Sequence, residues 1–352
     1  MAVTKLSIIV PSYDRAGKLL ETLRALCPQL VPSVTITVLD NCSPLAYETH
    51  CLTMESDLAR YVEQGSLRFI RNKYNVGMSA NFLKAFEICD AEWMWLISDD
   101  DRIYPDAVTS ILAEIDALSD RPEVAFVKFN RLTNGRAEVR EAGVLATLPE
   151  LIDTLAISAD RFNSYIFITN GLYRFPHFAG QIETGYRFLH TYVPHLMMLL
   201  HYVSLHDGEG AVFLSVREVA AYVKPEMGYH YGFVAGLGVG AFKNFTFNIS
   251  ETAYEKLECV FAAHNDYKVA LDIFYFSRAR ADMHVVRRLV RNYYLQIRSA
   301  RSLVDRSLFR CFMLLLYFPG LCERGSHLVS NLSPRVAAHI AEIRKRNGST
   351  SQ

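Results

Sequence analysis

The stretch Trp93-Met-Trp-Leu-Ile-Ser-Asp-Asp-Asp-Arg-Ile-Tyr104 changes abruptly from an apolar run to three consecutive carboxylates. The apolar run is short and bounded by polar residues, which is typical of a strand buried in a sheet. Apolar residues at helical spacing follow between Val108 and Leu118. A strand that ends in charge and is followed by a helix predicts an α/β sheet with a ligand site beyond its carboxyl edge.

The three carboxylates of Asp99, Asp100 and Asp101 repel one another unless a cation lies between them. Ligation by oxygen alone, with no His or Cys nearby, favours Mg²⁺ or Mn²⁺, which commonly share their coordination shell with substrate phosphates. The alternative is a solvated acidic turn before a helix that starts near Pro105. The cluster therefore predicts a divalent metal site at Asp99, Asp100 and Asp101 for a phosphorylated nucleotide.

The same strand and helix alternation occurs on both sides of this stretch. Further runs predict strands at 6–10, 34–39, 67–70 and 124–129, the first of them stopping at Pro11, and apolar stripes between them predict helices. Such alternation indicates a mostly parallel, Rossmann-like sheet with helices on both faces.

Composition sets wider limits. The 352 residues suffice for one large domain with an appendage or for two domains. Because 37 basic residues balance 37 acidic ones, no overall charge favours nucleic acid as a partner. Seven cysteines without C-x-x-C spacing favour buried thiols in a reducing cytosol. The N-terminus enters a short strand directly, which argues against a signal peptide or spanning helix.

The C-terminal part differs from the rest. The segment 284–310 contains one acidic residue, Asp305, and seven arginines, at positions 287, 288, 291, 298, 301, 306 and 310. An apolar run, Phe312–Phe318, follows that is too short to span a bilayer. Two interpretations stand equal: a basic amphipathic surface on anionic lipid, or a helix packed on the preceding domain with a solvated arginine face. The tail 344–352 is predicted to be disordered.

Polar residues follow four consecutive predicted strands: 11–15, 40–43, 71–75 and 99–101. Together these motifs resemble those of the family 2 glycosyltransferases, inverting enzymes of the GT-A fold, over roughly residues 5 to 130. The stretch from Ser7 to Asp14 resembles the family's first strand and nucleotide-facing loop. Asp40 resembles the acid that reads the pyrimidine base, 72–81 resembles the segment that opens the next helix, and 97–101 resembles the D-x-D motif.

The resemblance implies a set of nucleotide-sugar contacts: Pro11, Tyr13, Asp14, Arg15, Asp40, Asn41, Asn75, Gly77, Asn81, Asp99 and Asp100. Arg71 or Lys73 could contact the phosphates. Asp14, Asn75 and Asn81 could equally serve as turn or cap groups, and Gly77 favours a backbone role. Asn41 replaces a second acid usual in the family, which predicts a rearranged ribose contact. Ser98 precedes the triplet where Asp is frequent, so the metal-binding pair stays open between Asp99 with Asp101 and Asp100 with Asp101.

Inversion requires a base that takes the acceptor hydroxyl proton. Glu183 is the first candidate, followed by Asp160, His190 and His195, and Asp101 acts through the metal. An ordinary exposed carboxylate is the alternative for Glu183, and packing residues are the alternative for the histidines, including His230. Seven aromatic residues could stack on an acceptor sugar or form core: Phe162, Tyr165, Phe167, Tyr173, Phe175, Tyr186 and Tyr192.

The resemblance implies a GT-A catalytic domain at 1–235, with a nucleotide-sugar half at 1–130 and an acceptor half at 131–235, and a helical region at 236–343. It implies a metal-dependent (Mn²⁺ or Mg²⁺) inverting glycosyltransferase that uses UDP-, CDP- or GDP-sugars. The acceptor would be a glycan or polyprenyl-linked glycan of bacterial surface polysaccharide such as O-antigen, reached from the cytoplasmic face of the inner membrane. A nucleotidyltransferase is the enzymatic alternative, but no Gly-rich basic loop follows the first strand; an inactive glycan-binding module is the other.

Overall fold

The computed structural model of the protein describes residues 4–133, 136–157, 159–221, 250–252 and 255–256. The chain divides into two compact units, Met1–Glu226 with Phe247–Ile249, and Met227–Thr246 with Ser250–Gln352. The fold below is that of the first unit. The predicted helical region 236–343, its arginine-rich segment and the tail 344–352 lie outside the described residues, apart from 250–252 and 255–256.

Strands and helices alternate along the first unit. Its first half contains β1 (Leu6–Ser12), α1 (Ala16–Leu26), β2 (Val34–Asp40), α2 (Tyr47–Met54), α3 (Leu58–Glu63), β3 (Leu67–Arg71), α4 (Met78–Ile88), β4 (Trp93–Leu96), β5 (Arg102–Ile103) and α5 (Ala107–Ala117). Its second half contains β6 (Phe126–Lys128), β7 (Leu132–Thr133), β8 (Arg136–Ala137), β9 (Gly143–Leu145), α6 (Leu148–Ala156), α7 (Ala159–Ile166), β10 (Gly171–Arg174), α8 (Phe175–Ala179), α9 (Ile182–Arg187), α10 (Pro194–Leu205), β11 (Val212–Leu214) and β12 (Ala220–Ala221). Short 3₁₀ turns η1 (Cys27–Gln29), η2 (Ile168–Asn170) and η3 (Leu189–Thr191) connect some of them.

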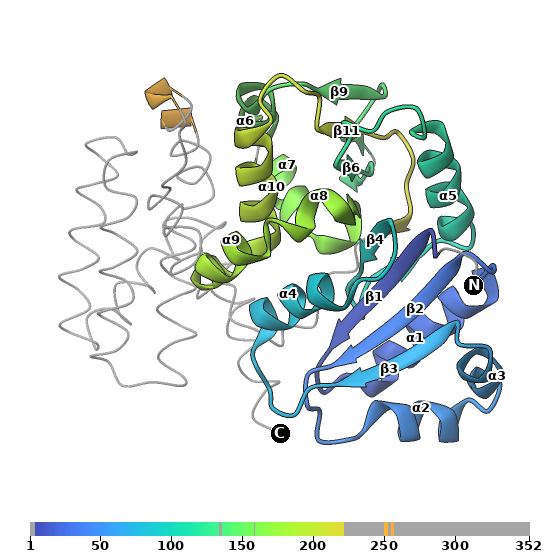
Figure 1. Ribbon diagram of the computed structural model, residues 1–352. Helices are drawn as coiled ribbons and strands as arrows, with labels where there is room; N and C mark the ends of the chain where they lie inside the picture. Colours follow the sequence, from blue (N-terminus) through green and yellow to red (C-terminus); the bar gives the residue numbers. More distant parts are fainter. Residues whose placement is uncertain (1–3, 134–135, 158, 222–249, 253–254, 257–352) are drawn as a thin grey trace, which may run out of the picture. The chain divides into compact units, whose positions relative to one another are not determined.

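The central sheet has the strand order β3-β2-β1-β4-β10-β6-β11-β9. The first four strands are parallel neighbours, while β10 runs antiparallel between β4 and β6. Figure 1 shows β3, β2, β1 and β4 side by side, with α1 behind them. The prediction of a mostly parallel GT-A-type sheet is confirmed, and the carboxyl ends of its four parallel strands share one edge.

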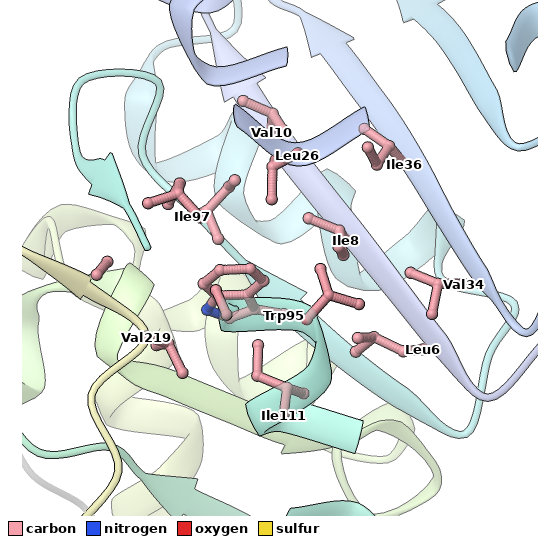
Figure 2. Packing of buried hydrophobic residues seen from close by; sticks show 14 of the residues in the cluster. Leu6, Ile8, Val10, Leu26, Val34, Ile36, Trp95, Ile97, Ile111 and Val219 are labelled. Atoms are coloured by element: carbon pink, nitrogen blue, oxygen red, sulfur yellow. The ribbon is translucent and has the colours of Figure 1, made fainter. Parts of the chain in front are cut away.

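One face of the sheet is covered by α1, α2, α3 and α5. Figure 2 shows Ile8 of β1 and Trp95 of β4 pointing toward Leu26 of α1 and Ile111 of α5, all of them fully buried. Burial of such side chains provides about 1.5–3 kcal/mol each, which fixes the strands beneath these helices. The strands that carry the motifs are therefore held rigidly.

The opposite face is packed by aromatic residues. The ring of Phe86 in α4 lies edge-on to Tyr173 of β10 at 5.1 Å between centroids, and Phe178 of α8 contacts both. Phe162 and Tyr165 are also buried. Phe162, Tyr165 and Tyr173, three of the seven candidate stacking aromatics, are therefore core residues rather than a platform for a sugar.

The first strand is longer than the sequence predicts. It continues past Pro11 to Ser12, with Pro11 opposite Leu39 and Ser12 opposite Asp40. Pairing of β1 with β4 ends at Ile9, so the N–H that proline lacks is not needed on that side. The extension carries Ser12 to the sheet edge beside the acidic triplet. The last predicted strand is instead shorter, because only Phe126–Lys128 pairs.

Among the described cysteines, Cys27, Cys51 and Cys89 are buried free thiols. Burial raises their pKa values to about 12, 11 and 11, which keeps them protonated and unreactive at neutral pH. Cys259, Cys311 and Cys322 lie outside the described residues.

Within the described part of the chain, no helix has the length and apolar character needed to cross a membrane.

Candidate functional site

The acidic triplet lies in the turn that follows β4 at the carboxyl edge of the sheet. Asp99 is 4% exposed, and its two oxygens are engaged separately. Ser12 Oγ donates a hydrogen bond to Asp99 Oδ2, and Arg15 Nη1 donates to Asp99 Oδ1 at 3.0 Å. The same Arg15 nitrogen donates to Asp100 Oδ2 at 2.8 Å. One guanidinium therefore joins two adjacent carboxylates.

Arg15 is held where the first strand turns into α1. Its backbone N–H donates to the Tyr47 hydroxyl at 2.8 Å, and its carbonyl accepts from Leu19 N in the first turn of α1. Burial lowers the pKa of Arg15, but the charges of Asp99 and Asp100 outweigh it and raise the pKa above the ordinary value. Arg15 is therefore permanently charged.

Burial acts on the pKa of Asp99 in the opposite direction from its action on the pKa of Arg15. Desolvation raises the pKa of this carboxyl, although the Ser12 hydrogen bond and the Arg15 charge act to lower it. The two partners therefore offset only part of the effect of burial on the pKa of Asp99. Arg15 is one of the ligand contacts predicted from the sequence, but its ion pairs with Asp99 and Asp100 are seen only in the structure.

The other two carboxylates are engaged by hydroxyl groups. Ser98 Oγ donates to Asp100 Oδ1, and Thr169 Oγ1 donates to Asp101 Oδ2 at 2.5 Å. Thr169 Oγ1 also accepts from Ser98 N at 2.9 Å. Thr169 belongs to η2, just before β10, so a segment far along the chain contacts the acidic triplet directly. The sequence carried no signal for this residue.

The donor set fits a hard divalent cation in its chemistry, because it is made of carboxylate and hydroxyl oxygens. Within the described residues, however, no three His, Cys, Asp or Glu side chains are arranged as a ready-made metal cage. Arg15 lies against Asp99 and Asp100 instead. A cation that used either of these carboxylates would have to compete with that guanidinium.

The second strand end forms a separate ion pair. Asp40, 2% exposed, accepts from Ser43 N at 2.8 Å and from Arg71 Nη1 at 2.6 Å. Arg71 Nη2 also donates to the Ser43 carbonyl at 2.6 Å. The arginine that the sequence analysis considered for phosphate therefore lies beside the acid predicted to read the base.

Four asparagines tie the second strand end to the start of α4. Asn41 Nδ2 donates to Asn75 Oδ1 at 2.9 Å, and Asn41 Oδ1 accepts from Asn72 Nδ2 and Val76 N at 3.0 Å. Asn72 Nδ2 also donates to Asn81 Oδ1 at 2.8 Å. Both ends of the Asn41 amide are thus used within the protein. This network explains why an amide can replace the second acid here.

The remaining predicted contacts surround this edge. Tyr13 is exposed, and Pro11 before it is buried. Asp14 adopts a positive φ of 53°, and its backbone N–H donates to Ser43 Oγ at 3.0 Å. Gly77, with φ of 83°, turns the chain into α4, which is the backbone role expected of it. The four strand ends therefore converge as predicted.

The candidate bases lie on other elements. Glu183 in α9 is exposed and pairs with Arg187 one turn later at 2.6 Å. His195 is buried at the start of α10, with Nε2 3.0 Å from the Ile166 carbonyl, and burial lowers its pKa to about 4. His190 is exposed and stacks on Phe188. Asp160 lies on α7, and His230 lies outside the described residues.

Comparisons with known proteins agree with this arrangement. The family model described as glycosyl transferase family 2 matches residues 7–168. The crystal structure of S. aureus TarS 1–349 with UDP-GlcNAc is 14% identical, covers 89% of this chain and 87% of its own, and has a TM-score of 0.54. The UDP complex of the same protein is 15% identical with the same coverage and TM-score. These two structures share the fold.

A mannosyltransferase from Pyrobaculum calidifontis, solved with GDP-Man and Mn²⁺, is 14% identical, covers 100% of this chain and 89% of its own, and has a lower TM-score of 0.49. No curated protein matches the chain. The family match runs from within β1 to the first residue of η2, so it includes all four strand ends and stops one residue before Thr169. The match of residues 7–168 to the glycosyl transferase family 2 model, together with the shared fold, supports a glycosyltransferase of GT-A type.

Proposed function

We propose that the protein is a metal-dependent, inverting glycosyltransferase that moves a sugar from a nucleotide diphosphate to a hydroxyl of a glycan or lipid-linked glycan. The observation that carries this proposal is the convergence of Asp40 and the Asp99–Asp101 triplet at one sheet edge. Asp40 would hold the base and the triplet a metal-bound diphosphate, and a ligand site at this edge of the sheet suits a nucleotide-sugar donor.

The nucleotide end would be formed by Asp40, Arg71 and Tyr13. The Asp40 carboxylate accepts hydrogen bonds and the Arg71 guanidinium donates them, so the pair can match both kinds of group on a pyrimidine edge. The exposed Tyr13 ring supplies an apolar surface beside them. UDP is the first donor nucleotide to test, since TarS, which shares the fold, was crystallised with UDP and UDP-GlcNAc; CDP and GDP follow.

The diphosphate end would be formed by the acidic triplet. Asp101, with Asp99 or Asp100, would hold Mn²⁺ or Mg²⁺, which when bound acts as a Lewis acid for the leaving diphosphate. Thr169 holds the Asp101 carboxylate in a fixed orientation through its hydroxyl. Ser98 does the same for Asp100. The protein thus supplies preorganised oxygens, and no side-chain acid is needed to protonate the leaving group.

The acceptor hydroxyl would lose its proton to Glu183, whose carboxylate is exposed on α9. The family resemblance supports a bacterial surface polysaccharide, such as O-antigen, as the product. The arginine-rich segment 284–310 supports a peripheral position on an anionic, cytoplasmic membrane face. Salt-sensitive sedimentation with anionic but not neutral vesicles tests that position.

Thermal unfolding with a panel of UDP-, CDP- and GDP-sugars, with and without Mn²⁺, tests the donor proposal. A donor at a hundred times its Kd adds about 2.7 kcal/mol to the free energy of unfolding, which raises Tm by several degrees. Asp40→Asn should reduce that shift, whereas Glu48→Gln, at an exposed position of α2, should preserve it. If no donor raised Tm even with metal, the proposal would be wrong.

A further inference from the structure

Arg15 pairs with two of the three carboxylates that a cation of the acidic triplet would use. Its Nη1 atom lies 3.0 Å from Asp99 Oδ1 and 2.8 Å from Asp100 Oδ2, and the three side chains are 25%, 4% and 11% exposed. Two adjacent carboxylates this far from water are unfavourable without a positive charge beside them. The folded protein therefore contains its own counter-cation at this site.

The Arg15 side chain can leave the carboxylates while its main chain stays in place. Its main chain is fixed, because its N–H donates to Tyr47 and its carbonyl accepts from Leu19. Both ion pairs are made by a single terminal nitrogen of a long side chain. Movement of that side chain alone would release both carboxylates, while the backbone of α1 stayed in place.

A divalent ion that arrives alone gains two carboxylates but must expel Arg15 from a half-buried position. The guanidinium then loses two charge-assisted hydrogen bonds with no new partner. When a nucleotide diphosphate arrives with the metal, its oxygens complete the metal shell and also provide an anion for the released guanidinium. The balance therefore favours metal binding only in the presence of the diphosphate.

We propose that Arg15 is a resident counter-cation that makes metal binding depend on the donor diphosphate. In the free protein Arg15 neutralises Asp99 and Asp100 and keeps the affinity for metal low. With donor bound, its guanidinium moves to the diphosphate and acts as a positioning residue. This inference rests on the proposed metal-dependent function and extends it to the order in which metal and donor bind.

The test is Mn²⁺ affinity measured by the electron paramagnetic resonance signal of free Mn²⁺, with no sugar transfer involved. In the wild-type protein, adding UDP should tighten Mn²⁺ binding. Arg15→Met should bind Mn²⁺ about tenfold or more tightly than wild type without nucleotide, a gain of about 1.4 kcal/mol. The tightening caused by UDP should shrink in the variant. A residue with only a structural role would not raise metal affinity when removed.

The matched control is Arg24→Met. Arg24 lies on α1, which begins directly after Arg15, and pairs with Glu55 rather than the triplet, so its loss removes the same charge and should leave Mn²⁺ affinity without nucleotide unchanged. If Arg15→Met does not fold, Arg15→Gln can replace it. This variant also removes the charge, keeps hydrogen-bond donors and gives the same comparison. The metal-free Tm of either Arg15 variant should fall, and Mn²⁺ should restore it.

Two results would overturn the inference and are distinguishable. If wild type binds Mn²⁺ with UDP but the Arg15 variants bind Mn²⁺ no more tightly, the counter-cation role is wrong while the metal-dependent function stands. If Mn²⁺ binds to neither protein even with UDP, metal dependence itself fails, and the inference fails with it.

Discussion

Thr169 Oγ1 donates a hydrogen bond to Asp101 Oδ2 at 2.5 Å, although the two residues are 68 positions apart in the chain. The same oxygen accepts from Ser98 N at 2.9 Å. One hydroxyl therefore bonds to the residue before the acidic triplet and to its last carboxylate. A segment that follows α7 thus contributes to the orientation of the Asp101 carboxylate.

Thr169→Val tests this support. The substitution keeps the shape of the side chain but removes the hydroxyl that bonds to Ser98 N and to Asp101, so the free energy of unfolding should fall by about 1–3 kcal/mol. Mn²⁺ affinity in the presence of UDP should also fall, because Asp101 loses its fixed orientation. Urea unfolding and Mn²⁺ titration measure the two effects. Thr169→Ser, which keeps the hydroxyl, should retain most of both; equal losses in the two variants would contradict this role.

Asn41→Asp should destabilise the protein even though it restores the residue usual in the family. The amide donates to Asn75 Oδ1 and to the Gly77 carbonyl, so a carboxylate would face two acceptors in a site only 3% exposed. We expect a loss of about 1–3 kcal/mol at pH 7 by urea unfolding. The loss should shrink at lower pH, since a protonated carboxyl can donate again. A variant as stable as wild type at pH 7 would show that the network is not needed.

His195 should make stability fall as the solution becomes acidic. Burial holds its folded-state pKa at about 4, below the ordinary value of 6.5, so the unfolded chain binds more protons between these values. The stability present above pH 6.5 is lost as the pH falls toward 4, up to about 3 kcal/mol from this group.

Urea unfolding at pH 7 and pH 5 measures the effect of His195. His195→Gln keeps a donor for the Ile166 carbonyl but cannot titrate, so the difference between the two pH values should be smaller than in wild type. His190→Gln, at an exposed position, is the control and should leave the difference unchanged. The same pH dependence in wild type and His195→Gln would rule out this histidine as its source.

Glu183→Gln tests the proposed base. Turnover should fall by about 10²-fold or more, because the amide cannot accept the acceptor proton, while UDP and Mn²⁺ binding should survive. Steady-state kinetics measure turnover, and nucleotide titration measures the binding of UDP and Mn²⁺. Arg187→Met is the paired control: it removes the ion pair and leaves the carboxylate, so turnover should change little. Full activity of Glu183→Gln would leave Glu183 as a surface residue and require another base.

The sequence was sufficient for the sheet and for the position of the site. Continuous apolar runs such as 6–10 predict strands buried on both faces, and the helical stripes between them require parallel neighbours. Polar residues at the ends of β1 to β4 were therefore expected to meet, and they do. The strand limits were less exact: β1 passes Pro11 because β4 has already ended there.

What lay beyond the sequence was the pairing of these groups. Arg15 with Asp99 and Asp100, Thr169 with Asp101, and Arg71 with Asp40 are separated by 84, 85, 68 and 31 positions. No periodicity or local propensity relates such residues, because their distances depend on strand register and on the rotamer of each long side chain. The sequence by itself determined that charge and polarity gather at one sheet edge. Only the tertiary structure decided that the charge is already neutralised by an arginine of the same chain, since burial of adjacent carboxylates demands a cation wherever packing can place one.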